Sequence, residues 1–218
     1  MRLSDPHVVS VNVGLPQTVA TPKRKVTTAI WKTAVDGRVR TRGDNLEGDA
    51  QADRKNHGGP HKAIYAYAAE DLAFWTERQG REFGPGAMGE NLTTVGIDPN
   101  EALIGERWAV GSTILEVSEP RSPCYRLGLR HDDPTLVRAF VAAQRPGTYL
   151  RIIQQGDVGA GDRIDVISRP AHDVTVRLAF RAWQIDRSLV PLLRHAPELS
   201  EAWKSWIADD RYRPVTFG

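Results

Sequence analysis

The segment RWAVGSTILEVSEPRSPCYRL, residues 107–127, joins a β-prone stretch to the single cysteine of this 218-residue chain. Apolar and β-branched residues on both sides of Gly111 predict two short strands, and Pro120 ends the second one. Pro120 and Pro123 then place Cys124 on a stiff loop rather than inside a strand. The segment therefore predicts β structure with a cysteine just beyond the end of a strand.

Short β-prone stretches recur on both sides of this segment. Residues 7–13 and 26–35 precede it, and residues 148–168 follow it. Two helices are expected between the strands, one after a short strand at residues 63–67 and the other over residues 132–147. Many short strands with turns between them and few helices are typical of a barrel-like fold, so the expected fold is mainly β.

The composition changes near residue 170, where apolar residues begin to recur at a spacing of three to four. This periodicity predicts three helices. Asp186 is expected to cap the second helix, and Pro197 to lie in the first turn of the third. We therefore expect a mainly β domain over residues 1–170 and a small three-helix domain over residues 171–218.

Composition excludes several classes of protein. The net charge of +2 gives no indication of a surface for nucleic acid. No apolar run has the length of a membrane helix, and the N-terminus lacks the apolar core of a secretory signal. One cysteine excludes an internal disulfide and any zinc or iron–sulfur site built from several cysteines. We expect a cytoplasmic protein with neither nucleic acid nor membrane as a partner.

Cys124 has two interpretations from its surroundings alone. Free cysteines are among the most buried residues, so it can simply fill space in the core. Arg121 and Arg126, however, favour the thiolate, which acts as a nucleophile or as a ligand for a metal delivered in a preformed cofactor. A nucleophile would need a base such as His57 or His131. Spacing does not choose between these roles.

A glycine-rich loop over residues 42–61 gathers charged residues that serve either chemistry or solvation. Asp49, Asp53 and His57 are candidates for acid–base work, although a solvated loop has the same composition. The amides of Gly58 and Gly59 can approach a ligand closely, or the pair can form a tight turn.

A second glycine-rich loop, GENLT at residues 89–93, allows the same two interpretations. Glu90 and Asn91 can orient a ligand through hydrogen bonds, or they can brace a turn. Taken alone, neither loop identifies a function.

Four segments in order resemble the MOSC domain family: LEGDAQADRKNHGGPHKAIYAY (46–67), GENLTTVGI (89–97), IGERWAVG (104–111) and EVSEPRSPCYRL (116–127). The C-terminal segment is similar to the three-helix domain of the YiiM-type branch. The resemblance implies a β-barrel that holds a molybdenum cofactor (molybdopterin), with Cys124 as the protein ligand to molybdenum. The family's cofactor site matches the following residues of this chain: His57, Gly58, Gly59, Glu90, Asn91, Arg121, Ser122, Pro123 and Cys124. Lys32 and Arg24 are implied to meet the cofactor's phosphate.

The same resemblance implies an oxidoreductase that reduces N-hydroxylated compounds, such as 6-hydroxylaminopurine, to the amine. Asp49, Asp53 and His57 are candidates for delivering protons, since cleavage of an N–O bond consumes them. The chain has no GxGxxG motif and too few cysteines for an iron–sulfur cluster, so a separate reductase is expected to supply electrons. The alternatives are a carrier of the cofactor or its sulfur without turnover, and, ranked below it, a cysteine hydrolase.

Overall fold

The computed structural model describes residues 5–22, 24–52 and 58–209. Within these ranges the strands are β1 (His7–Val13), β2 (Gln17–Ala20), β3 (Lys25–Thr28), β4 (Thr33–Ala34), β5 (Arg38–Arg42), β6 (Asn45–Leu46), β7 (Ile64–Ala68), β8 (Leu92–Val95), β9 (Arg107–Val110), β10 (Thr113–Pro120), β11 (Thr148–Gln154), β12 (Asp157–Gly159) and β13 (Ile164–Ser168). The α-helices are α1 (Ala69–Gln79), α2 (Tyr125–His131), α3 (Leu136–Ala143), α4 (Val176–Gln184) and α5 (Glu201–Ala208). The 3-10 helices are η1 (Pro60–Lys62) and η2 (Arg187–His195). None of these described helices combines the length and apolar character that crossing a membrane requires.

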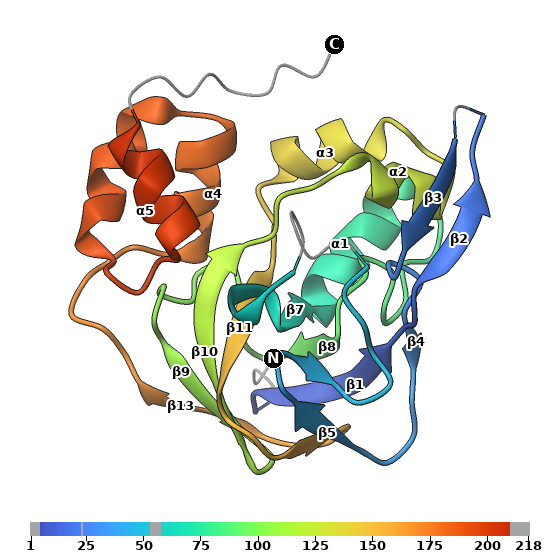
Figure 1. The fold of residues 1–218 in the computed structure, drawn as a ribbon, viewed down its shortest axis with the longest axis horizontal. Coiled ribbons are helices and arrows are strands. Elements are labelled where there is room, and N and C mark those ends of the chain that lie inside the picture. The colour runs from blue at the N-terminus through green and yellow to red at the C-terminus, as the bar shows by residue number, and fades with distance from the viewer. Residues whose placement is uncertain (1–4, 23, 53–57, 210–218) are drawn as a thin grey trace.

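Eight strands form the main sheet, in the order β13-β9-β10-β11-β7-β8-β1-β4 (Figure 1). Neighbours pair antiparallel except β7 and β8, which run parallel with α1 in the connection between them, as a parallel pair requires a crossover. Pro120 at the end of β10 pairs with Thr148 at the start of β11. This register places the loop that carries Cys124 at the edge where β11 begins.

β1, which is next to last in this order, comes close to β13 at the opposite end of the main sheet. His7 of β1 forms an isolated antiparallel bridge with Arg163, which precedes β13. The amide of Val8 also donates to the carbonyl oxygen of Asp162 at 2.9 Å. The sheet is therefore strongly curled, although β1 and the segment before β13 meet through this bridge rather than through a continuous strand pair. The expectation of a mainly β fold is confirmed.

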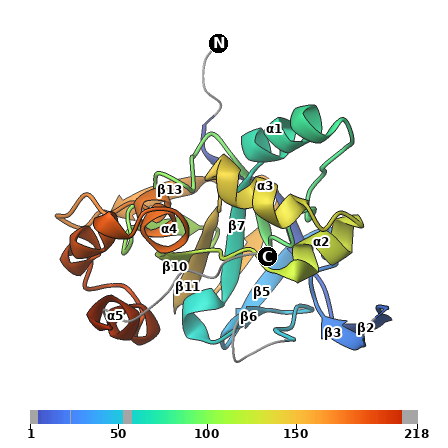
Figure 2. The ribbon, with the colours of Figure 1, turned by 90° about the horizontal axis from the view of Figure 1, so that it is seen from above.

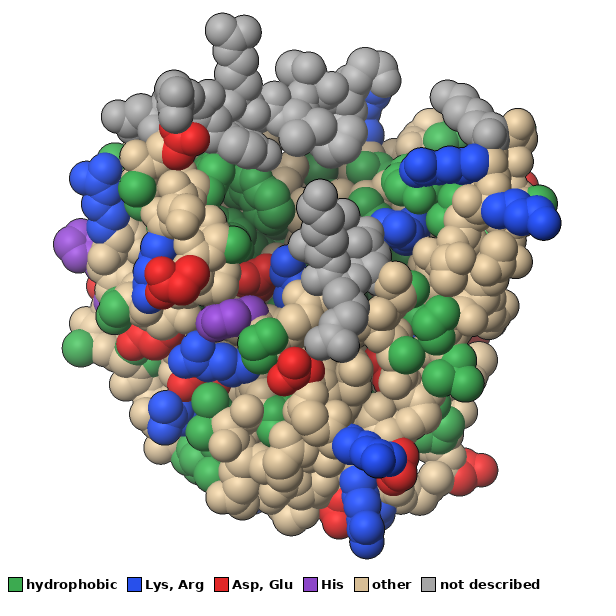
Figure 3. All heavy atoms as spheres, in the orientation of Figure 1, with side chains coloured by type: hydrophobic (Ala, Val, Ile, Leu, Met, Phe, Trp, Pro, Cys, Tyr) green, Lys and Arg blue, Asp and Glu red, His purple; other side chains and the backbone are tan. Residues whose placement is uncertain are grey.

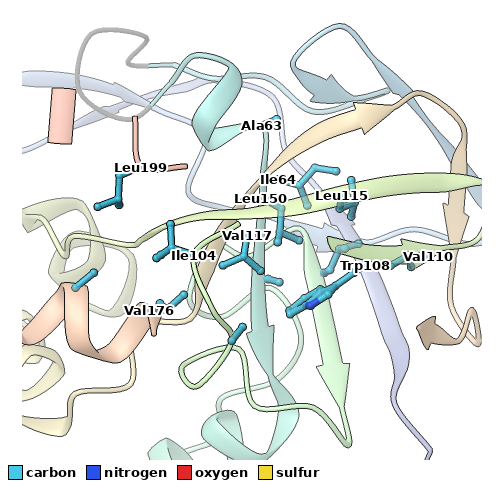
Figure 4. Packing of buried hydrophobic residues seen from close by; sticks show 14 of the residues in the cluster. Ala63, Ile64, Ile104, Trp108, Val110, Leu115, Val117, Leu150, Val176 and Leu199 are labelled. Carbon is cyan, nitrogen blue, oxygen red and sulfur yellow. The ribbon is translucent and has the colours of Figure 1, made fainter. Parts of the chain in front are cut away.

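Two clusters of buried apolar residues form the core. The larger joins sheet residues such as Trp108 and Leu150 to Val176 and Leu199 of the C-terminal segment (Figure 4). The smaller lies around Trp75 of α1 and packs against α2 and α3. The division of the chain at residue 170 stays a prediction, and the parts on either side of it share the larger cluster.

The C-terminal segment contains three helical elements, α4, η2 and α5, beside β9 and β10 (Figure 1). Asp186 caps η2 as expected, because its side chain accepts a hydrogen bond from the amide of Ser188 at 3.0 Å. The expectation for Pro197 was wrong: α5 begins at Glu201 with Ser200 as its cap. Ser200 accepts from the amide of Trp203, which a hydroxyl can do and a proline cannot.

The helix α2 was not predicted, since only two helices were expected before residue 170. It is seven residues long and contains Gly128, so no apolar periodicity stands out. Tertiary contacts explain it: Leu127 is fully buried, and a Cβ at position 128 would lie 2.9 Å from the carbonyl oxygen of Asp133. Close packing of the next turn therefore requires the glycine that weakens the sequence signal.

Candidate functional site

Cys124 lies in a pocket of about 110 Å³ where five segments distant in sequence converge. These segments are the stretch from the end of β3 to the turn before β4, the loop after β6, the residues from η1 into β7, the loop before β8, and the loop after β10 with the start of α2; one residue of β11 completes the lining. The lining residues are Thr28, Ala29, Ile30, Lys32, Asp49, Ala50, Gln51, Ala52, Lys62, Ala63, Tyr65, Gly89, Asn91, Arg121, Cys124, Arg126 and Tyr149.

Cys124 is half-buried and stands immediately before α2. Its backbone is extended, with φ −135° and ψ 169°, and its carbonyl oxygen accepts from the amide of Leu127 at 2.9 Å. Arg130, near the end of the same helix, donates to the carbonyl oxygen of Ile30 at 2.7 Å. The helix thus fixes both the cysteine and the opposite wall of the pocket.

Arg121 places a buried cation in this pocket. Its side chain is 6% exposed, and its guanidinium carbon lies 5.1 Å from the ring centre of Tyr65 and 5.6 Å from that of Phe140. Among the described residues, its Nη1 atom has no hydrogen-bond partner. A buried donor without a partner is unfavourable, so this arrangement fits a ligand that brings an anionic group.

Positive charge dominates the pocket. Among the residues that the structure describes, Lys32, Lys62, Arg121 and Arg126 line it, against one carboxylate, that of Asp49. On the face shown in Figure 3, basic side chains are interspersed with acidic ones rather than gathered in one patch. The excess of cations is therefore a local property of the pocket, and it favours a phosphate-sized anion.

Asp49 is held within a hydrogen-bond network and is almost fully buried. Its Oδ1 atom accepts from the ammonium of Lys32 and from the amide of Gly14 at 2.9 Å, and its Oδ2 atom accepts from Asn91 at 3.0 Å. Burial lowers the pKa of Lys32, while the charge of Asp49 opposes that effect. Asp49 and Lys32 thus form a paired acid–base couple in the pocket wall.

Glu90 lies behind the pocket instead of lining it. It is fully buried and accepts from the amides of Gly86 at 2.6 Å and Met88 at 2.9 Å, and from the hydroxyl of Thr93 at 2.9 Å. Burial raises the pKa of Glu90, and these hydrogen bonds oppose the rise. Of the two roles expected for this loop, Glu90 therefore has the structural one: it braces the turn.

Asn91 does line the pocket and also braces it. Its Oδ1 atom accepts from the amide of Tyr65 at 3.1 Å, and its Nδ2 atom donates to the carbonyl oxygen of Asn12 at 3.2 Å. It therefore joins β7, β1 and the Asp49 loop in one place.

The Gly58–Gly59 turn is tied to the pocket through Gln51, which sequence reasoning missed. The amide of Gly59 donates to Oε1 of Gln51 at 2.8 Å, and φ of Gly59 is +93°, a value that favours glycine. Neither glycine is among the lining residues. The amide of Gly59 already donates to Gln51, so Gly59 serves a tight turn rather than a contact with a ligand.

Four other residues expected at the site are not among the described residues that line the pocket. Ser122 and Pro123 precede Cys124 without lining the pocket, and the hydroxyl of Ser122 accepts from Gln184 of α4 at 3.3 Å. Asp53 and His57 lie outside the described residues.

Arg24 lines a second cavity of about 840 Å³ together with residues of β3 and of α2. Figure 2 shows the β2–β3 hairpin beside α2. It donates to the hydroxyl of Tyr125 at 3.4 Å, and its guanidinium carbon lies 5.9 Å from that ring. Tyr125 lines this second cavity as well, and it follows Cys124 directly in the chain. Arg24 therefore lies near the cysteine loop but outside the first pocket.

Sequence reasoning also missed two tyrosines of the pocket. Tyr65 on β7 pairs with Tyr149 on β11, and their ring centres are 5.2 Å apart. Burial raises the pKa of Tyr149 to about 12, so its phenol stays neutral near pH 7. No local pattern marks these residues, because only strand pairing brings them together.

His131 does not serve Cys124 as a base. It bonds to the carbonyl oxygen of Ala87 at 2.8 Å, stacks on Phe83 with ring centres 4.7 Å apart, and is absent from the pocket lining. No group of three or more His, Cys, Asp or Glu residues suited to a metal occurs in ranges 5–22, 24–52 and 58–209. A metal at Cys124 would therefore draw most of its ligands from a preformed cofactor.

Comparisons with known proteins agree with this geometry. A model of the MOSC domain matches residues 53–165. The chain is 34% identical to uncharacterized protein YflK of Bacillus subtilis (strain 168), over 95% of this chain and 96% of that protein. It is also 34% identical to protein YiiM of Escherichia coli (strain K12), over 80% of each. A reductase of Gibberella moniliformis is 28% identical over 88% of this chain, which corresponds to 38% of that longer protein.

Solved structures support the same relationship. The crystal structure of YiiM from Geobacillus stearothermophilus matches with a TM-score of 0.77 and 29% identity, covering 93% of this chain and 97% of that one. The match thus extends from the main sheet through the C-terminal helices. Both the sequence and the fold lead to one conclusion: this chain belongs to the MOSC domain family, in its YiiM-type branch.

Proposed function

We propose that this chain is an oxidoreductase that holds a molybdenum cofactor through Cys124 and reduces N-hydroxylated compounds to amines. The observation that carries the proposal is the presence, in one pocket, of a thiol and of a buried arginine whose Nη1 atom has no partner among the described residues. A cofactor that joins a metal to a phosphate would engage both groups. The fungal relative, which is named as a reductase, supports the direction of the reaction.

The residues present fit such a cofactor. The thiolate of Cys124 is a soft ligand for the metal, and Arg121 offers an unused donor to the phosphate. Lys32, Lys62 and Arg126 add positive charge around the same site. The neutral phenol of Tyr149 can give or take a hydrogen bond with the pterin's polar edge.

Reduction of a hydroxylamine to an amine and water consumes two electrons and two protons. When bound, the molybdenum cofactor supplies the redox chemistry of this reaction. The chain's own residues would then bind the cofactor and provide protons. Among the expected proton donors, Asp49 is bonded to Lys32, whose pKa is lowered by burial. We therefore assign proton delivery to the Lys32–Asp49 pair rather than to Asp49 alone.

The electrons are proposed to come from a separate reductase. The chain has a single cysteine, too few for an iron–sulfur cluster. The fungal reductase is longer, and 38% of its length aligns with this chain. We therefore expect the electron donor of this chain to be a separate protein.

The test measures molybdenum and turnover together. We expect about one molybdenum per purified chain, and conversion of 6-hydroxylaminopurine to adenine when a chemical reductant is added. Cys124→Ser should remove both, whereas Ser168→Ala, at an exposed site on β13, should remove neither. Bound molybdenum without turnover would instead support a cofactor carrier. Turnover that survives removal of molybdenum would contradict the proposal.

A further inference from the structure

Three side chains connect the C-terminal helices to the pocket. The hydroxyl of Ser200, at the start of α5, donates to Oε2 of Glu119 at 3.1 Å. The other carboxylate oxygen of Glu119 lies 3.3 Å from the ammonium nitrogen of Lys62, which lines the pocket. Ser200 is 6% exposed and Glu119 is 4% exposed, so the contact between these two side chains is shielded from water. Shielding strengthens such a charge-assisted contact.

The direction of the Ser200 hydrogen bond is determined by its second contact. Its oxygen accepts from the amide of Trp203 at 3.4 Å, as the cap of α5. A hydroxyl has a single proton, which is then available to Glu119. The beginning of α5 thereby orients the carboxylate at the end of β10.

The carboxylate in turn restricts the lysine. A lysine side chain has a flexible stem and three N–H donors, and it loses considerable rotamer freedom when it is fixed. Glu119 holds the ammonium at the wall of the pocket, 3.3 Å from one of its carboxylate oxygens. A lysine that is already positioned binds an anion more tightly, because less ordering remains to be done on binding.

A second contact joins the C-terminal helices to the loop that follows β10. Gln184, at the end of α4, donates to the hydroxyl of Ser122 at 3.3 Å, two positions before Cys124. Two helices of the C-terminal segment thus contact residues 119–122 at separate points. This is the arrangement expected if the helices support the pocket, and not merely the back of the sheet.

We propose that the C-terminal helices position Lys62 as an anion-binding residue of the pocket, with Ser200 and Glu119 as positioning residues. The inference rests on the proposed function only in requiring that the pocket binds an anionic group. It assigns the C-terminal segment a role in ligand binding through one named route.

Inorganic phosphate is the probe for this route, titrated calorimetrically into the full chain at low ionic strength. Lys62→Gln should weaken phosphate binding about tenfold, the loss of one charge-assisted hydrogen bond. Ser200→Ala should weaken it about threefold, and Ser200→Thr, which keeps the hydroxyl, should bind like the wild type. Ser205→Ala, an exposed serine on the same helix, is the matched control and should also bind like the wild type.

A double mutant separates positioning from general stability. If Ser200 acts through Glu119 and Lys62, then Ser200→Ala should have no further effect on phosphate affinity in a Lys62→Gln chain. An equal loss in both backgrounds would overturn the inference, as would unchanged affinity in Ser200→Ala. Phosphate binding needs neither molybdenum nor turnover. A failed reductase assay with this coupling intact would therefore contradict the proposed function alone.

Discussion

The guanidinium group of Arg121 lies over the ring of Tyr65, 5.1 Å from its centre, with its Nη1 atom lacking a hydrogen-bond partner in the described part of the chain. Aromatic faces stabilise a buried cation in part, and hydrogen bonds with Tyr65 and Tyr149 engage other donors of the guanidinium. Burial lowers the pKa of Arg121, whereas Tyr65, Tyr149 and Cys124 raise it and prevail. The arginine therefore stays charged beside the cysteine, ready to meet an anion.

Replacing this arginine should separate binding from stability. Arg121→Met removes a buried charge without leaving a carboxylate unpaired, so the cofactor-free protein should change its free energy of unfolding by less than about 1 kcal/mol. Molybdenum content should fall at least about tenfold with the loss of a charge-assisted contact. Metal analysis and urea unfolding measure the two effects.

Arg145→Met is the contrasting variant, because Arg145 is paired with the buried carboxylate of Asp71. It should lower stability clearly more than Arg121→Met, since it leaves Asp71 uncompensated. Equal destabilisation by both variants would show that Arg121 is structural.

The Lys32–Asp49 pair should behave as a buried ion pair. Asp49→Asn leaves the ammonium of Lys32 without its counter-charge and should reduce the free energy of unfolding by about 3 kcal/mol. The double variant Asp49→Asn with Lys32→Met should recover part of that loss, because no charge is then buried alone. Denaturant unfolding of the four proteins in the cycle measures the coupling. Simple additivity of the two single variants would contradict a direct pair.

Gly86 should be more sensitive to substitution than its backbone angle alone explains. Its φ is +81°, and a Cβ would lie 2.6 Å from the carbonyl oxygen of Lys32. Gly37 has a similar φ of +79° with nothing within 4 Å of such a Cβ, which makes it the matched control. Gly37→Ala should cost about 1 kcal/mol for the left-handed backbone, and Gly86→Ala about 1–3 kcal/mol more for the clash. Equal losses in denaturant unfolding would refute the close approach.

Acid should weaken the protein through His131. Burial lowers the pKa of His131, with Arg130 and Arg81 acting in the same direction and the bond to Ala87 opposing it. Below pH 6.5 the unfolded chain therefore takes up a proton that the folded chain refuses, and stability falls down to the lowered pKa of the folded state. The slope from one such group is at most about 1.4 kcal/mol per pH unit. In His131→Gln, a plot of the free energy of unfolding against pH should be flatter in this window. An unchanged slope would show that the pH dependence comes from other groups, such as His61.

Local patterns in the sequence were sufficient for much of the fold. Residues on both sides of Gly111 form β9 and β10 as expected, and Pro120 ends β10. The strand before α1 and the capping of η2 by Asp186 were also predicted. These features depend on neighbours within a few positions, and alternation, proline and capping residues report on such neighbours directly.

The site was predictable only in part, for the same reason. Cys124, Arg121, Lys32, Asp49 and Asn91 were singled out beforehand, and the structure brings them into one pocket. Glu90 was singled out as well, yet the structure places it behind the pocket, because hydrogen bonds with Gly86 and Thr93, four and three positions away, turn its side chain inward. Whether a polar residue faces a ligand or a turn depends on the direction of its side chain, which residue type does not reveal.

By itself, then, the sequence determined the mainly β fold, the loop that carries Cys124 and the basic residues near it, since these follow from local pattern. Only the tertiary structure decided which residues meet there. Strand pairing joins Tyr65 to Tyr149, and a contact across 81 positions joins Ser200 to Glu119 and so to Lys62. Such contacts follow from how the sheet curls and how the helices cover it, and no stretch of local sequence contains that information.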